Sequence, residues 1–467
     1  MVLLFFTDIT VFCFYGCNSR DQQFDFGREN PKQTKHELDF SIHSVEIKEQ
    51  TAIISMDATP ESFERHIWIQ STNNTTTVHS SDTDIMEVSL DDGEYRFWVE
   101  YTSESGEIYG KNNVIHQYVG SNRLIYRSEI RLPFAMDVWI EDDIAVIAGG
   151  LNEDISMLLV DTSDVFEPKI VYQFENIGYI RDVKIFDNLL FAAIDPESDG
   201  CSLCDGVGIR IYDISQPSSP KLLSEIGEPT TAVHNLYYDK GFLYAASQSE
   251  SVLAIFDVRD PEFPNRIASW QPNMVSPPFA LDPGVNSHDM VVIDSILYVA
   301  HGLGFSLVDV SNPYLPKDIE NQYVEFGTHN IWPTEDGSYI LTTREISSGP
   351  LQIWSQNSES FELEYTNAHD IISVHNVHVR GNYAFVSWYT DGVYVFLLDD
   401  IQEPIEIGSF DTYDQDIPFF EDMVSGTILP PIMGAWGICP YGNTIVVGDT
   451  MRGLLLFDFF PLYIEIE

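Results

Sequence analysis

Four histidines recur at one position of a repeated sequence pattern. His234, His329 and His375 are each followed by asparagine, and His288 is followed by aspartate. Imidazole is the commonest metal ligand in proteins and the side chain that most readily exchanges a proton near neutral pH. Each pair begins a run of alternating apolar residues, which predicts a β-strand. We therefore expect each pair to open the first strand of a repeated unit.

The same position can be followed through seven units. Aligning the opening strands places further polar or aromatic residues beside the histidines: Asp137, Asp182, Asn235, Asp289, Asn330, Asn376 and Trp436. If the units surround a channel, these residues line it at one height. Because alternate residues of a strand point to opposite sides, we expect either the histidines or their neighbours to face the channel axis, but not both.

Two interpretations of the histidines stay open. Three or four converging imidazoles without thiolates suit Zn, Cu, Ni or Fe better than Ca or Mg, with the neighbouring Asp and Asn residues fixing the orientation of each ring. Alternatively, the pairs clamp adjacent units together by satisfying buried backbone groups. No GxSxG, Walker or dinucleotide-binding motif is present, so no catalytic residue can be named.

A second pattern completes each unit. A strand ends in Asp and is followed by a turn containing proline, as in IRIYDISQPSSPKLL and FSLVDVSNPYLPKDI. The Asp can accept hydrogen bonds from backbone amides of the turn, and the prolines preset φ. Repeated four-stranded units of about 40 to 50 residues predict an all-β protein with a seven-bladed β-propeller over residues 120–467. Residues 123–133 are expected to complete or abut the last blade and close the ring.

The chain before the propeller has three predicted parts. Residues 38–119 contain short alternating strands between turn clusters, which predicts a small immunoglobulin- or fibronectin-like β-sandwich. Residues 18–37 read as a polar linker. Residues 1–17 resemble a lipoprotein signal that would leave Cys17 lipidated, with a misassigned start codon as the alternative.

Charge and cysteine content limit the partners and the compartment. The chain has 73 acidic and 23 basic residues, a formal net charge of −50. Such a surface repels a phosphate backbone, so nucleic acid is excluded, and we expect membrane contact only through the lipid. Cys201 and Cys204 are expected to form a disulfide in an oxidising compartment. Cys439 reads as a small buried hydrophobe.

Several long motifs resemble the choice-of-anchor B family of LVIVD-repeat propellers. They are His288-Asp289, THNIWPTEDGSYILTTRE, HNVHVRGNYAFVSWYTDGVYVF and GAWGICPYGNTIVVGDTMRGLLLF, within residues 230–458. TTRE stands where an Asp-Glu pair is expected, and His329-Asn330 stands where His-Gln is more usual. The resemblance implies a propeller tethered to the cell surface and brings no activity.

These observations predict an exported, lipid-anchored protein of the cell envelope. Its function would be to bind a protein, glycan or small-molecule ligand that the sequence does not identify. The alternative is a metalloenzyme, an oxidase or hydrolase, whose metal is held at the histidine end of the channel.

Overall fold

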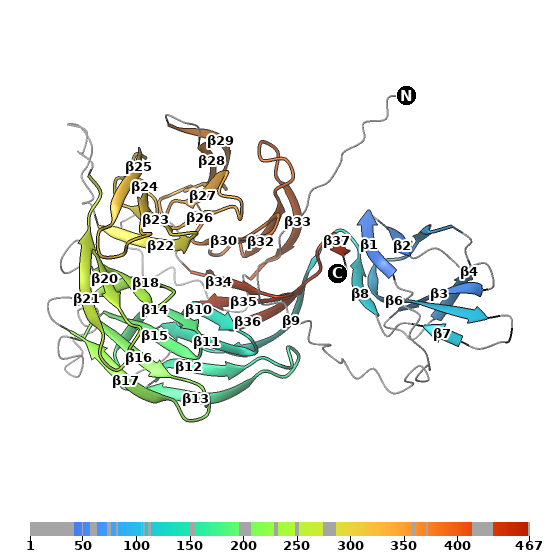
Figure 1. The fold of residues 1–467 in the computed structure, drawn as a ribbon, viewed down its shortest axis with the longest axis horizontal. Helices are drawn as coiled ribbons and strands as arrows, with labels where there is room; N and C mark the ends of the chain where they lie inside the picture. The colour runs from blue at the N-terminus through green and yellow to red at the C-terminus, as the bar shows by residue number, and fades with distance from the viewer. Residues whose placement is uncertain are drawn as a thin grey trace.

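A computed structural model describes residues 42–48, 50–56, 63–71, 76–80, 83–103, 105, 108–110, 114–149, 155–195, 207–227, 232–247, 252–273, 286–356, 360–369, 372–412 and 433–465. The described residues form β-strands joined by turns and loops, and the strands pair antiparallel in nine sheets (Figure 1). In this part of the chain no helix is both long and apolar enough to span a membrane.

The four-stranded sheets formed by strands β9 to β36 are arranged radially as a β-propeller (Figure 1). Six of them consist of consecutive strands: β10 (Ala135–Glu141), β11 (Ile144–Gly149), β12 (Ile155–Asp161), β13 (Lys169–Glu175); β14 (Tyr179–Phe186), β15 (Leu189–Asp195), β16 (Ile209–Asp213), β17 (Lys221–Ile226); β18 (Val233–Asp239), β19 (Phe242–Ser247), β20 (Val252–Asp257), β21 (Asn265–Trp270); β22 (Ser287–Ile293), β23 (Ile296–His301), β24 (Gly304–Asp309), β25 (Lys317–Tyr323); β26 (Ile331–Pro333), β27 (Tyr339–Thr343), β28 (Leu351–Gln356), β29 (Phe361–Asn367); β30 (Val377–Arg380), β31 (Tyr383–Ser387), β32 (Val393–Leu397), β33 (Ile405–Phe410).

The seventh sheet joins distant parts of the chain. It contains β34 (Ala435–Tyr441), β35 (Thr444–Asp449), β36 (Gly453–Phe459) and, as its fourth strand, β9 (Leu124–Arg131). β9 precedes all the other strands of the propeller, and it pairs with β36 from Leu124 opposite Phe459 to Arg131 opposite Gly453. The prediction that residues 123–133 complete the last sheet is therefore confirmed. β9 thereby covers the edge of β36 that would otherwise be left unpaired.

Apolar side chains fill the spaces between neighbouring sheets of the propeller. Tyr244 and Leu253 of the third sheet, for example, belong to one buried cluster with Met290 and Leu297 of the fourth. The middle strands are apolar on both faces, because each sheet packs against a neighbour on each side. This radial packing directs the first strand of every sheet toward the centre of the ring.

The turns between third and fourth strands repeat one geometry, which explains the repeated Asp. The carboxylates accept hydrogen bonds from backbone N–H groups two residues ahead, as the sequence predicts. The Oδ1 atom is the acceptor in Asp161 to Ser163 (3.0 Å), Asp213 to Ser215 (2.9 Å), Asp257 to Arg259 (3.2 Å), Asp309 to Ser311 (2.9 Å) and Asp400 to Gln402 (3.0 Å). The Asp residues of the repeat therefore have a structural role, which is to stabilise these turns.

Two further sheets share a core of their own. One orders β37 (Tyr463–Glu465), β1 (Ile42–Lys48), β2 (Thr51–Met56) and β5 (Ile85–Ser89); the other contains β4 (Thr76–Ser80), β3 (Phe63–Ser71), β6 (Gly93–Ser103) and β7 (Ile108–Gly110), with β8 (Ile115–Val119) paired to β6. Buried residues of both, such as Val45 and Phe97, form one cluster. β37 comes from the end of the chain, so the last strand crosses the boundary expected near residue 120.

A buried arginine holds this junction together. The side chain of Arg123 donates to the backbone oxygens of Phe460 (2.8 Å), Pro461 (3.0 Å) and Tyr118 and to Oε1 of Gln117 (2.7 Å). Only 1 % of Arg123 is exposed, and burial lowers its pKa to about 10. Its hydrogen-bond partners are uncharged oxygens, and its guanidinium also lies 5.8 Å from the centre of the Tyr118 ring. The side chain thus joins the start of β9, the end of β8 and the segment before β37 without an ion pair among these contacts.

Candidate metal centre

A β-bulge positions the histidines and their neighbours. His329 N–H donates to the backbone oxygen of Thr343 (2.8 Å), while Thr343 N–H donates to the backbone oxygen of Asn330 (3.0 Å). His329 and Asn330 of one strand segment thus both face the single residue Thr343 of the next strand. His375 and Asn376 face Ser387 in the same way, and the pairing register shifts at the matching level of β10, β14, β18, β22 and β34.

The bulge overturns one expectation from the sequence. Strict alternation would send only one member of each pair toward the channel, but an extra residue breaks that alternation locally. Both His329 and Asn330 reach the first strands of neighbouring sheets, as the contacts below show. The two interpretations of the pairs are therefore not exclusive, because the imidazole and the amide can have separate roles.

The four histidine rings form an arc along successive first strands. The ring centroids of His234 and His288 are 4.1 Å apart, and those of His288 and His329 are also 4.1 Å apart. His375 lies 4.3 Å from His329 and 4.5 Å from the ring of Trp436. The aligned positions of the first two sheets hold Met136 and Arg181, so the arc and Trp436 together occupy five of the seven positions at this level.

Backbone carbonyls of the next sheet orient two of these rings. The Nδ1 atom of His329 is 3.0 Å from the backbone oxygen of His375, and Nδ1 of His375 is 2.9 Å from that of Trp436. A carbonyl only accepts, so Nδ1 carries the proton and donates it. Nε2 is then left with its lone pair, which is the atom a metal binds. The ring orientation expected from Asp and Asn comes instead from these carbonyls.

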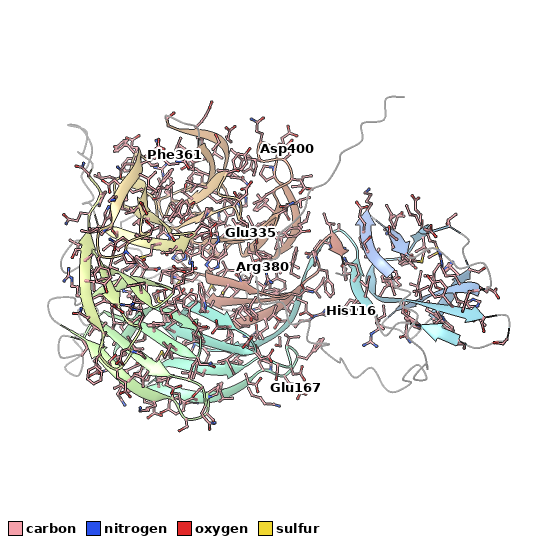
Figure 2. The ribbon with its side chains drawn as sticks, viewed as in Figure 1. His116, Glu167, Glu335, Phe361, Arg380 and Asp400 are labelled. Carbon is pink, nitrogen blue, oxygen red and sulfur yellow. The ribbon has the colours of Figure 1, made fainter. Side chains whose placement is uncertain are left out.

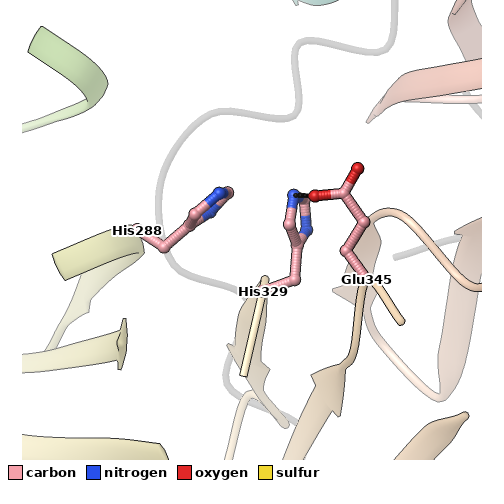
Figure 3. A group of neighbouring side chains, drawn as sticks. All are labelled: His288, His329 and Glu345. Carbon is pink, nitrogen blue, oxygen red and sulfur yellow. Dashed lines mark ion pairs between the residues drawn. The ribbon is translucent and has the colours of Figure 1, made fainter. Parts of the chain in front are cut away.

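A carboxylate meets the arc at its centre. Glu345 follows β27 in the fifth sheet, and its Oε2 lies 3.4 Å from Nε2 of His329 (Figure 3). Ligand atoms of His288, His329 and Glu345 all lie within 4.8 Å of one another. The Tyr389 hydroxyl donates to the other oxygen of Glu345, which fixes the carboxylate. The Glu345 side chain is 30 % exposed, so this group is open to solvent on one side.

Burial sets the protonation states of the group. It lowers the pKa of His329 to about 3, with the nearby His234 adding to the effect, and it holds the pKa of His288 well below its usual value. Burial also raises the pKa of Glu345, an effect that the Tyr389 hydrogen bond and the charge of Arg181 oppose. The rings are therefore neutral at pH 7, as metal ligands must be.

Carboxylates next to the arc bind across the boundaries between sheets. Oδ2 of Asp137 accepts a hydrogen bond from the backbone N–H of Val183 (2.9 Å) in the next sheet. Oδ2 of Asp182 does the same for Leu236 (2.8 Å) in the sheet after that. These two residues therefore clamp neighbouring sheets, which is the role that the second interpretation assigned to the repeated pairs.

Asn330 connects three sheets. Its Nδ2 donates to Oδ2 of Asp289 (2.6 Å), and its Oδ1 accepts from the backbone N–H of Val377 (2.9 Å). Burial raises the pKa of Asp289 to about 6, and the hydrogen bond from Asn330 opposes that rise. Among the described residues, Oδ1 of Asn376 has no such partner, and neither does Oδ1 of Asn235. The hydrogen bonds that join neighbouring sheets are thus complete at Asn330 and incomplete at Asn235 and Asn376.

A buried lysine completes the charged layer. Lys184 contacts Asp182, lies 3.5 Å from Oδ2 of Asp137, and has its Nζ 4.9 Å from the centre of the Trp139 ring. Burial alone would lower the pKa of Lys184, but the charges of Asp137, Asp182 and Asp289 raise it above its ordinary value. The ammonium compensates part of the negative charge that the clamp brings into the channel.

Three residues of this region were not singled out from the sequence. Glu345 lies outside the aligned first strands and ends the TTRE motif, whose departure from the family pattern was the only signal. Arg181 and Lys184 flank Asp182, and the repeated pattern of the first strands points only to the Asp182 carboxylate.

The cysteines lie away from this group or outside the described residues. Cys439 is buried and unpaired, with a pKa raised by burial to about 12. Cys17, Cys201 and Cys204 lie outside the described residues.

Comparisons with known proteins agree with this architecture. The LVIVD repeat family matches residues 205–226, 286–321 and 373–412. The Cps50 (Swd1) β-propeller domain of Myceliophteria thermophila matches 72 % of this chain and 100 % of its own, at 12 % identity and a TM-score of 0.51. The computationally designed Ika8 protein matches the same shares at 9 % identity and 0.45. No curated protein matches. The chain is an all-β protein that carries LVIVD repeats on a β-propeller fold.

Proposed function

We propose that the protein is an exported interaction module: a seven-bladed LVIVD-repeat propeller of the choice-of-anchor B type, joined to a small β-sandwich and tethered to the cell envelope by lipid on Cys17. The propeller fold and the LVIVD repeats support an interaction role. The acidic surface favours a protein, glycan or small-molecule ligand over nucleic acid. Detergent partitioning of the full chain and of Cys17→Ser tests the anchor. Equal recovery of both proteins in the aqueous phase would refute it.

The histidine end of the channel is the functional centre of this module, and we assign it a transition-metal ion. The observation that carries this assignment is the convergence of His288, His329 and Glu345 within 4.8 Å. Two imidazoles and one carboxylate suit Zn or Fe better than Ca, which prefers a shell of oxygen ligands. With ligands about 2.1 Å from a tetrahedral metal, two ligand atoms lie about 3.4 Å apart. The distance between His329 Nε2 and Glu345 Oε2, 3.4 Å, equals that value, whereas the group as a whole spans up to 4.8 Å and must contract slightly around an ion.

The test is a metal assay on protein purified without a histidine tag or a chelator. We expect near-stoichiometric transition metal in the wild type, and competition with a chromophoric chelator gives its affinity. Glu345→Gln removes one ligand but keeps the hydrogen-bonding shape, so affinity should fall by about 100-fold or more. His369→Gln is the matched control, since His369 lies outside the arc and pairs with Asp391. Equal affinity of all three proteins, or no bound metal, would contradict the assignment.

One observation favours a metalloenzyme as the second candidate. Three protein ligands with a solvent-exposed carboxylate leave a coordination position open, as in catalytic zinc sites and unlike closed structural sites. A metal there would activate a bound water for hydrolysis. Cobalt(II) substitution tests whether the position is open: azide should change the visible spectrum of the cobalt protein. An unchanged spectrum in saturating azide would show a closed site and rule out this function.

A further inference from the structure

The other end of the channel has a floor of aromatic rings. Trp139, Tyr237, Trp332 and His378 each lie two residues beyond the clamp position of their first strand. The rings of Trp332 and His378 stack with centroids 4.1 Å apart, and the Trp139 centroid is 5.7 Å from His378 and 6.4 Å from Tyr237. Phe186 adds a fifth ring, 5.4 Å from Trp139. Side chains from five sheets therefore fill the channel at this level.

A cavity of about 280 Å³ opens over this floor. Its lining includes Trp139, Tyr237, Trp332 and His378 together with Glu141 and Arg380, so aromatic carbon, one carboxylate and one guanidinium meet in a single space. Pockets that bind small molecules start at about 300 Å³, so this volume suits a compact ligand. The metal centre does not reach here, because the clamp residues and Lys184 lie between the two ends.

The mouth of this cavity is strongly acidic. Its rim is formed by the turns between the first and second strands of the seven sheets, at residues 141–143, 187–188, 239–241, 294–295, 334–338, 380–382 and 441–443. These turns carry eight acidic and two basic residues: Glu141, Asp142, Asp143, Asp187, Asp239, Asp294, Glu335 and Asp336 against Lys240 and Arg380. The excess of carboxylates favours a cationic ligand.

Contacts within the rim hold its charges in place. Arg380 donates to the backbone oxygen of Gly442 (2.8 Å), and Glu335 accepts a hydrogen bond from Gly381 N–H (2.7 Å); Figure 2 labels both Glu335 and Arg380. Burial, and then the charges of Asp187 and Asp142, raise the pKa of Glu141 to about 7. Such repulsion between carboxylates is relieved when a cation binds beside them.

The floor already binds one ammonium group from below. The Nζ of Lys184 lies 4.9 Å from the centre of the Trp139 ring, within the range of a cation–π contact. Three carboxyl groups surround that lysine, so the layer beneath the floor does not carry a net positive charge that would repel a second cation. Aromatic faces under a negative field recognise methylated ammonium groups in preference to small hydrated ions.

We propose that the aromatic cavity at this mouth binds a small organic cation bearing a methylated or quaternary ammonium group. The ammonium rests on the rings of Trp139 and Trp332, and Glu141 supplies the opposite charge at the wall. This site is separate from the metal centre and does not depend on it.

The experiment compares choline with its uncharged isostere 3,3-dimethyl-1-butanol by titration calorimetry on the full chain. We expect choline to bind at least about tenfold more tightly, because a cation–π contact and the carboxylate act on the charged ligand alone. Equal affinities would overturn the proposal in favour of a merely apolar pocket. Absence of choline binding up to about 10 mM would overturn it as well.

Variants locate the binding site. Glu141→Gln should weaken choline binding about threefold to tenfold, and Trp332→Leu should weaken it by more. Asp336→Asn is the matched control, since Asp336 is on the rim but outside the cavity lining, and it should bind nearly as well as wild type. Glu345→Gln, which alters the metal centre, should leave choline binding unchanged. If Glu141→Gln binds choline as tightly as wild type, the proposed site is wrong, whether or not Trp332→Leu folds.

Discussion

Replacing Asn330 with alanine tests how much the cross-sheet clamp contributes to stability. The substitution removes the donor to Oδ2 of Asp289 and the acceptor for the backbone N–H of Val377. Asn330 is 2 % exposed, so water does not readily replace either partner. An orphaned buried N–H costs about 1 to 3 kcal/mol, and a lost hydrogen bond to a carboxylate costs about 1.5 to 3 kcal/mol. The free energy of unfolding should therefore fall by about 3 to 5 kcal/mol.

The control is Asn376→Ala, at the same position one sheet further on. Asn376 is similarly buried, at 8 % exposed, but its Oδ1 has no hydrogen-bond partner among the described residues. Its loss should cost about 1 kcal/mol or less.

Urea unfolding of both variants and the wild type, followed by tryptophan fluorescence with chelator present, measures the two costs independently of any bound metal. Equal losses at the two positions would refute the reasoning, because they would show that the amides act through packing and not through the bonds across sheets.

Three further outcomes follow from buried polar groups. Burial lowers the pKa of His301 to about 3, so its native ring stays neutral while the unfolded one takes up a proton below pH 6.5; the contribution of this residue to stability, present at pH 7, should fall by about 2 kcal/mol at pH 5, and His301→Gln should reduce the pH dependence in urea titrations by that amount. Arg123→Ala should lower the unfolding free energy by about 3 kcal/mol, whereas Arg131→Ala, at an exposed ion pair, should change it by less than about 1 kcal/mol; similar melting curves would contradict this. Cys439 should react with a thiol reagent only as fast as the chain unfolds, and rapid labelling of native protein would show that it is accessible.

The repeat made the propeller predictable, because the Asp-Pro turn and the alternating strands recur in register. The turn carboxylates of Asp161 and Asp309 bond as the sequence suggested, since an Asx turn depends on residues only two positions apart. Pairing of β9 with β36 was also predictable, because a ring needs a strand to close it. The pairing of β37 with β1 was not, since three residues near the chain end carry no pattern of their own.

The candidate site was harder to derive than the fold. Alignment placed the four histidines at one level, and the structure brings their rings within 4.1 to 4.3 Å of their neighbours. The bulge could not be foreseen, because a bulge changes register without changing the residue pattern. Glu345 was missed for a different reason: it reaches His329 from a loop, and loop geometry depends on tertiary contacts such as the Tyr389 hydrogen bond.

The late partner of β9 has a consequence for synthesis of the chain. The ribosome synthesises β9 more than 300 residues before β36. Until β36 emerges, this eight-residue strand therefore has no strand of its own chain to pair with. During that interval it can associate with another nascent chain, a hazard that grows when translation is slow or polysomes are crowded. An mRNA truncated before β36 would yield a polypeptide whose other sheets can form but whose ring of sheets cannot close. Such a product is a natural target for proteolysis.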